Sequence, residues 1–147
     1  MAQSLISLYE TDYYAWALQN AELMKQGRFE DLDTAHLIEE IESMGASEKR
    51  ALENSLIELM LHLLKWQFQK KRRGSNWEIS IHKQRIAVEK ILHDNPSLKY
   101  QLHERILECY VYASRYVVAE TKLLLTKFPT ECPYSMEQLA DTEYMPD

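Results

Sequence analysis

The sequence predicts an all-α fold: a helical bundle of about four main helices plus two short helices, with a long central third helix. Turn-forming residues are scarce, with 3 Gly and 4 Pro in 147 residues, and long stretches carry apolar residues at helical spacing. A β-sandwich or barrel would need many tight turns, which draw on Gly and Pro. The length suits a single helical domain over residues 1–147, with its core over about 9–127 and a tail carrying a short helix over 128–147.

The first two helices are expected between capping residues and glycines. Thr11 can cap a helix over residues 12–25, and Gly27 suits the left-handed conformation that ends a helix. A second helix is expected over residues 33–44, capped by its first residue and stopped at Gly45. Its apolar residues recur at helical spacing and predict one apolar face: Leu37, Ile38, Ile41 and Met44.

The third helix is expected from Ser47 to about Lys70, a stretch without Gly or Pro. One apolar row contains Leu52, Leu56, Leu59, Leu63 and Trp66, and a second row beside it contains Ile57, Met60, Leu64 and Phe68. At helical geometry the two rows cover an arc of about 200°, which is wider than a surface helix needs. We therefore expect a central helix that is buried on more than one side, or one that packs partly against a second copy of the protein.

A fourth helix is expected from residue 75 to about residue 93. Ser75 and Glu78 match a capping box, in which the serine caps the helix and the glutamate reaches back to it. Its apolar row contains Trp77, Ile81, Val88 and Leu92.

A fifth helix is expected to begin at Pro96, a favoured first position, and to reach at least Glu120. Its predicted apolar face contains Leu98, Leu102, Cys109, Ala113 and Tyr116. A second capping box at residues 135–138 predicts the short last helix, with Tyr134 and Leu139 placed as a hydrophobic staple.

Charge is unevenly distributed along this acidic chain, whose net charge is −6. Residues 1–60 carry 4 basic and 12 acidic groups, residues 61–105 carry 10 and 4, and residues 106–147 carry 3 and 7. The basic middle segment is the main charge signal. Its candidate site for an anion or an acidic partner contains Lys70, Lys71, Arg72, Arg73, Trp77 and Lys83.

The same basic run has a simpler structural interpretation. Lys and Arg are favoured at the end of a helix because they complement its dipole, and the acidic first helices can neutralise them. A net negative chain is also a poor general nucleic-acid binder.

A different candidate surface, for self-association, lies on the fourth helix and contains Ile79, His82 and Ile86.

The sequence offers no recognisable catalytic chemistry. Two Glu–His pairs have helical spacing, at residues 58 and 62 and at residues 78 and 82, but no Glu-x-x-His pattern recurs on two helices. No Gly-rich phosphate loop and no nucleophile elbow is present. We therefore assign no catalytic, metal-binding or cofactor-binding residue.

Several features favour the cytoplasm. No apolar stretch approaches the length needed to span a bilayer, and the first residues lack the pattern of a secretory signal. Cys109 and Cys132 form neither a metal-binding spacing nor a disulfide framework.

Several stretches resemble the domain of unknown function 29 (DUF29) family, which is common in cyanobacteria. They are YETDYYAWA at 9–17, LIEEIESMG at 37–45, HLLKWQ at 62–67, SNW at 75–77, and Phe128-Pro129 with CPYS at 132–135. The resemblance implies a helical bundle and transfers no activity. The run from Lys70 to Arg73 departs from the proline-containing segment of relatives, so a function of this run need not extend to the family.

These observations lead to one expected function and two alternatives. We expect a non-enzymatic helical interaction module that binds a protein partner or forms a homo-oligomer. One alternative is binding of nucleic acid, which is not favoured, or of another anionic partner through residues 65–90. The other is a small metal-dependent enzyme. A membrane is not expected among the partners.

Overall fold

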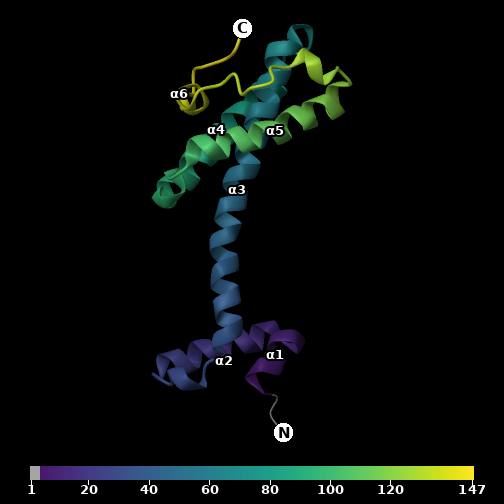
Figure 1. Ribbon diagram of the computed structural model, residues 1–147. Coiled ribbons are helices and arrows are strands. Elements are labelled where there is room, and N and C mark those ends of the chain that lie inside the picture. Colours follow the sequence, from purple (N-terminus) through teal and green to yellow (C-terminus); the bar gives the residue numbers. More distant parts are fainter. Residues whose placement is uncertain (1–3) are drawn as a thin grey trace. The chain divides into compact units, whose positions relative to one another are not determined.

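The computed structural model describes residues 4–147, whose path is shown in Figure 1. These residues contain no strand. Their α-helices are α1 (Leu5–Thr11), α2 (Tyr13–Lys25), α3 (Thr34–Phe68), α4 (Ser75–Asp94), α5 (Leu102–Thr121) and α6 (Met136–Ala140). The predicted all-α fold with four long helices and two short ones is therefore confirmed.

The chain divides into two compact units, Met1–Ala46 and Ser47–Asp147, which we call the N-terminal unit and the C-terminal unit. The N-terminal unit holds α1, α2 and the first turns of α3. The C-terminal unit holds the rest of α3 together with α4, α5 and α6. The expectation of one domain over the whole chain stays a prediction.

The N-terminal unit contains a helix that the sequence did not predict. Thr11, expected as a cap, is instead the last residue of α1. The next residue, Asp12, caps α2 by accepting a hydrogen bond from the backbone N–H of Ala15 at 3.1 Å. Gly27 follows α2 with φ of 72°, which confirms the expected left-handed stop.

The predicted break at Gly45 is wrong, because α3 runs through this residue as one helix of 35 residues. A glycine inside a helix costs only about 1 kcal/mol relative to alanine, and good helix formers on both sides outweigh that cost. Proline, the residue that would stop the helix, is absent from α3.

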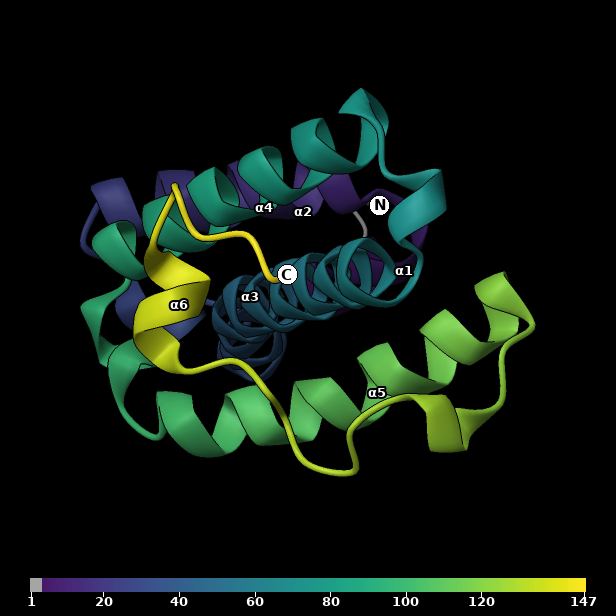
Figure 2. The same ribbon diagram turned by 90° about the horizontal axis from the view of Figure 1, so that it is seen from above.

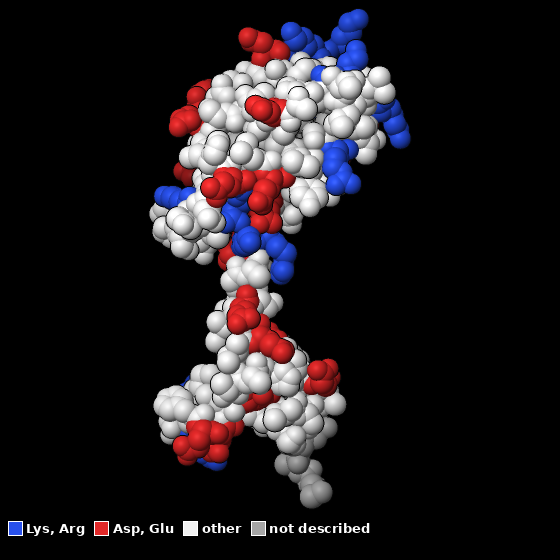
Figure 3. All heavy atoms as spheres, viewed as in Figure 1, with Lys and Arg blue, Asp and Glu red and all other residues white. Residues whose placement is uncertain are grey.

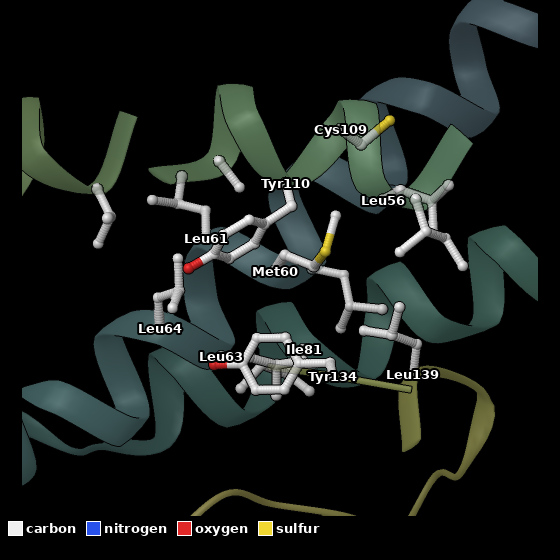
Figure 4. Close-up of a cluster of buried hydrophobic side chains, with 14 of the residues drawn as sticks. Leu56, Met60, Leu61, Leu63, Leu64, Ile81, Cys109, Tyr110, Tyr134 and Leu139 are labelled. Atoms are coloured by element: carbon white, nitrogen blue, oxygen red, sulfur yellow. The ribbon is translucent and has the colours of Figure 1, made fainter. Parts of the chain in front are cut away.

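The core of the C-terminal unit is built around α3, which Figure 2 shows between α4 and α5. Figure 4 shows the side chains of this core. The prediction that Leu56, Leu59 and Leu63 are buried is confirmed, as is burial of α3 on more than one side. The buried residues of α3 are Leu52, Leu56, Leu59, Met60, Leu61, Leu63 and Leu64.

The ends of α4 and α5 differ from the predicted ones. Ser75 is the first residue of α4 and Gly74 precedes it without a side-chain hydrogen bond, so the expected capping box at Ser75 is not formed. Pro96 begins a short 3-10 helix, η3 (Pro96–Lys99), and α5 starts only at Leu102. Tyr116 is exposed, and its neighbour Val117 takes the expected place in the core.

The C-terminal tail packs onto this core. The predicted capping box of α6 is confirmed, with Ser135 accepting from the backbone N–H of Gln138 at 3.1 Å and donating its own backbone N–H to the Gln138 side chain at 3.0 Å. Tyr134 and Leu139, which flank this turn, are both buried in the core. Two more 3-10 helices complete the unit, η2 (Lys70–Arg72) after α3 and η4 (Leu125–Lys127) after α5.

Candidate functional site

A buried polar cluster joins α2 to the start of α3. Asp33, just before α3, accepts a hydrogen bond from the indole Nε1 of Trp16 at 2.9 Å and lies 2.6 Å from Nδ1 of His36. Asn20 is buried and accepts the backbone N–H of Asp33 at 3.1 Å, while its own amide donates to the Trp16 carbonyl at 2.9 Å. Burial raises the pKa of Asp33, but hydrogen bonds from His36 and Trp16 outweigh it, and the pKa is lowered.

Two tyrosines extend this cluster to α1. Tyr9 and Tyr13 donate their hydroxyls to the two carboxylate oxygens of Glu40, each at 2.5 Å, and the ring of Tyr9 stacks on His36 with centroids 3.9 Å apart. The hydrogen bond to Glu40 raises the pKa of Tyr9 to about 12. Bonds from Tyr13 and Tyr9 lower the pKa of Glu40. Because both oxygens already accept hydrogen bonds, Glu40 serves as a structural link between α1, α2 and α3.

The first turns of α3 carry an exposed apolar row, Ile38, Ile41 and Met44, with exposed fractions of 50%, 63% and 68%. The predicted apolar face of this segment therefore exists, but most of it faces solvent. His36 and Glu40, which lie one turn apart, occupy the face that contacts α1 and α2. The row lies on another side of the helix and is exposed.

Three of the candidate basic residues lie together at the end of α3. Lys70, Lys71 and Arg72 form η2 and are exposed. An open groove of about 460 Å³ begins here, and its lining residues are Gln67, Phe68, Gln69, Lys70, Lys71, Arg72 and Leu123. The groove combines cationic side chains with an apolar floor, so it suits an anion that also carries apolar groups.

The other three candidate residues have different surroundings. Arg73 donates from Nε to the Trp66 carbonyl at 2.7 Å, and its guanidinium lies 4.8 Å from the centroid of that indole ring. Trp77 is half-buried, with the ammonium of Lys65 5.9 Å from its ring centroid. Lys83 is exposed on α4. The structure thus brings three cations together and engages Arg73 within the fold.

The candidate self-association face on α4 is exposed as a row of Ile79, His82 and Ile86. Sequence reasoning missed Arg85, which is buried and donates hydrogen bonds to the carbonyls of Leu139 at 3.1 Å and Gln138 at 3.0 Å. Burial lowers the pKa of Arg85. This arginine therefore ties α4 to α6.

The Glu–His pairs are not assembled into a metal centre. His62 places Nδ1 2.7 Å from the backbone carbonyl of Glu58, which is a local bond within α3. Glu78 and His82 line a groove of about 230 Å³ together with Glu143. Within residues 4–147, no group of three His, Cys, Asp or Glu side chains is placed to hold a metal ion.

The two cysteines are free thiols. Burial raises the pKa of Cys109 to about 11, so this thiol stays protonated near neutral pH and is a poor nucleophile.

No helix in the described part of the chain combines the length and apolar character needed to cross a bilayer.

Comparison with known proteins identifies a family. No curated protein and no solved structure matches the sequence. Residues 8–145, nearly the whole chain, match the family described as domain of unknown function DUF29. The resemblance noted in the sequence is therefore confirmed, and the chain belongs to the DUF29 family.

Proposed function

We propose that this protein is a non-enzymatic helical interaction module that associates with a second copy of itself through the apolar row Ile38, Ile41 and Met44. The exposure of these three side chains is the observation that carries the proposal. Apolar residues three and four positions apart form the ridges by which one helix packs against another. Exposed as a contiguous group, they are more typical of an interface than of an ordinary surface.

The segment of α3 that carries the apolar row is fixed by contacts with α1 and α2. On the neighbouring side of α3, His36 and Glu40 are fixed by the aromatic rings and hydroxyls of α1 and α2. A surface ordered before binding loses little conformational freedom when a partner docks. A row that meets its own copy forms an isologous contact, the commonest arrangement in soluble homodimers.

The α4 face of the C-terminal unit offers a separate contact between copies. A stable protein interface buries about 1,600 Å² in total, which is more than three side chains from each partner supply. Ile79, His82 and Ile86 form a second exposed row that is free to take part. We assign it a supporting role as a second, independent contact.

Charge gives the proposed contact a recognisable salt dependence. Residues 1–46 carry 9 acidic and 2 basic side chains, so their net charge is −7. Two copies of the N-terminal unit therefore repel each other at low ionic strength, and added salt screens that repulsion. Self-association through the α3 row should strengthen with salt, whereas binding by opposite charges should weaken.

Sedimentation velocity of the full chain over a micromolar concentration series tests the proposal. We expect a dimer that dissociates on dilution and that Ile41→Glu converts to a monomer, because the new carboxylate would be buried without a partner. Leu107→Glu, at an exposed position on α5, is the matched control and should leave the dimer intact. A wild-type chain that remains monomeric throughout would overturn the proposal, as would a dimer that Ile86→Glu dissociates and Ile41→Glu does not.

A second candidate function is binding of an anionic partner through Lys70, Lys71 and Arg72. The observation that favours it is their joint exposure beside a groove. Nucleic acid is the less favoured form of this partner because the chain is acidic overall. With either function we place the protein in the cytoplasm, where free thiols such as Cys109 and Cys132 are usual.

A further inference from the structure

We propose that the C-terminal unit docks on the surface of an anionic lipid bilayer through a basic and apolar corner. The corner consists of η2 and of residues 122–127, where the chain leaves α5 and forms η4. The inference rests on the second candidate function and names the partner class. It departs from the sequence-based expectation of no membrane partner, which considered spanning segments and secretory signals.

Five exposed cations belong to this corner. Three of them are Lys70, Lys71 and Arg72, and the other two, Lys122 and Lys127, bracket a short apolar segment. Within the part of the chain that the structure describes, none of the five forms an ion pair. Their charges are therefore available to anionic groups outside the protein.

Two leucines between these lysines are unusually exposed. Leu124 is 70% exposed and Leu125 is 56% exposed, at a point where the chain turns from α5 into η4. Aliphatic side chains of this size have no favourable contact with water and no polar group to offer a ligand. A partner that offers an apolar layer beside anionic groups would bury the leucines and would also bind the lysines.

The corner is fixed by the fold on both sides. Before the leucines, Lys122 caps the end of α5 with a left-handed φ of 64°, and Leu123 lines the groove beside η2. After them, Phe128 is buried and packs edge-to-face on Phe68, with ring centroids 5.3 Å apart. The leucines are therefore displayed by an anchored backbone and are not the end of a frayed helix.

The two basic segments are neighbours in space although they lie far apart in the sequence. The groove of about 460 Å³ is lined from one side by η2 and Phe68 and from the other by Leu123. Figure 3 shows Lys and Arg side chains gathered at this end of the C-terminal unit. The groove therefore brings η2 next to Leu123, the first residue of the apolar segment between Lys122 and Lys127.

An anionic lipid surface is the partner that can bind both the exposed leucines and the exposed cations. Peripheral proteins bind anionic bilayers by apolar side chains that enter the interface and by Lys and Arg that remain at the headgroups. Nucleic acid would engage the cations, but its bases stack on aromatic rings and gain little from exposed leucines. The combination of Leu124 and Leu125 with five unpaired cations therefore favours a lipid surface.

Flotation of the full chain with vesicles tests the inference. We expect the chain to bind vesicles that contain phosphatidylglycerol, to ignore vesicles of phosphatidylcholine alone, and to be released by salt. The double variant Lys71→Ala/Arg72→Ala should lower the partition coefficient about 30-fold, since each cation near an anionic surface contributes about one kcal/mol. Leu124→Ser should lower it about tenfold.

Matched control variants distinguish an effect of the corner itself from an effect of net charge or of protein stability. Lys25→Ala/Lys99→Ala removes the same charge from exposed positions outside the corner, and Leu107→Ser removes an exposed leucine from the middle of α5. Both should bind vesicles as the wild type does.

Three results would overturn the lipid assignment. The first is equal binding to both kinds of vesicle, and the second is equal loss of binding in the control variants. The third is binding to polyuridylate RNA that requires Lys71 and Arg72 while anionic vesicles fail to bind. This last result would keep the anionic-partner function and change the class of the partner.

Discussion

The carboxylate of Asp33 is buried between Trp16 and His36, and a buried charge is tolerated only where neighbours compensate for lost hydration. Trp16 donates to this carboxylate, and Nδ1 of His36 lies within hydrogen-bond distance of it. Asn20 then holds the backbone on which Asp33 sits. The stability of the N-terminal unit therefore depends on a few polar side chains, and replacing any one of them would remove a hydrogen bond made by another.

Trp16→Phe tests this dependence. The variant keeps an aromatic ring but removes the Nε1 donor, and the loss of a hydrogen bond to a buried charge costs about 2 kcal/mol. We expect faster amide hydrogen exchange in α2 and in the first turns of α3, measured by mass spectrometry. Tyr14→Phe, at an exposed position on the same helix, should leave exchange unchanged. Equal exchange in the wild type and Trp16→Phe would show that the indole donor contributes nothing.

At the scale of elements, the continuity of α3 through Gly45 is the main departure from expectation. Gly27 ends α2 with φ of 72°, whereas Gly45 lies within the helix and a Cβ added to it would meet no atom within 4 Å. The same residue type thus has opposite effects at two positions, because its backbone conformation differs.

Replacing each glycine with alanine should separate these two roles. Gly45→Ala should raise the free energy of unfolding by up to about 1 kcal/mol, since alanine favours the helical conformation. Gly27→Ala should lower it by about 1 kcal/mol, because a Cβ disfavours the left-handed backbone. Urea unfolding followed by far-ultraviolet circular dichroism measures both. If Gly45→Ala were the destabilising variant, the helix would be broken there in solution.

Local patterns predicted most of the helical stretches, but they missed α1, placed a break at Gly45 inside α3 and began α5 at Pro96 instead of Leu102. The buried leucines of α3 were predictable because their periodicity repeats over several turns. Ser135 forms its capping box as predicted, whereas Ser75 is already inside α4 and Gly74 occupies the cap position. A capping pattern in the sequence does not determine which of two adjacent residues begins the helix, because the helix can start one residue earlier than the pattern suggests.

Much of the candidate site was beyond sequence reasoning for a different reason. Trp16 and Asp33 are 17 residues apart, and their contact follows from the packing of two helices. The basic run was visible in the composition, but the engagement of Arg73 depends on Trp66, seven residues away, and on the distant Pro146, whose carbonyl lies 3.4 Å from its Nη2. The exposure of Leu124 likewise appears only when the fold is known.

At the scale of the whole molecule, the two compact units are stabilised by different interactions. In the described part of the N-terminal unit, only Leu8 and Trp16 are buried apolar side chains, so polar and aromatic contacts carry much of its stability. The C-terminal unit has an extensive apolar core assembled from α3, α4, α5 and the tail. Apolar burial does not depend on protonation, so the two units should respond differently to acid.

Acid should therefore unfold the N-terminal unit first. Hydrogen bonds lower the pKa of Asp33 and of Glu40 in the folded chain. A carboxyl group with a lowered folded pKa stabilises the protein above its unfolded pKa, and that stabilisation is lost as pH falls through the folded pKa. Below about pH 4 we expect the amide protection factors to fall in α2 before they fall in α5. In the described part of the C-terminal unit, the carboxyl group with a lowered pKa is that of Asp94, which is exposed at the end of α4 and pairs with Lys90.

The variant Glu40→Gln provides the specific test, because it removes one titrating group and keeps the size of the side chain. At neutral pH it should destabilise the N-terminal unit, since tyrosine hydroxyls lose a charged acceptor, and in acid its exchange rates should approach those of the wild type. Glu39→Gln, at an exposed position next in sequence, is the control and should follow the wild-type pH profile. If α2 and α5 lost protection at the same pH in every variant, the two units would share one stability and the Glu40 cluster would have no separate role.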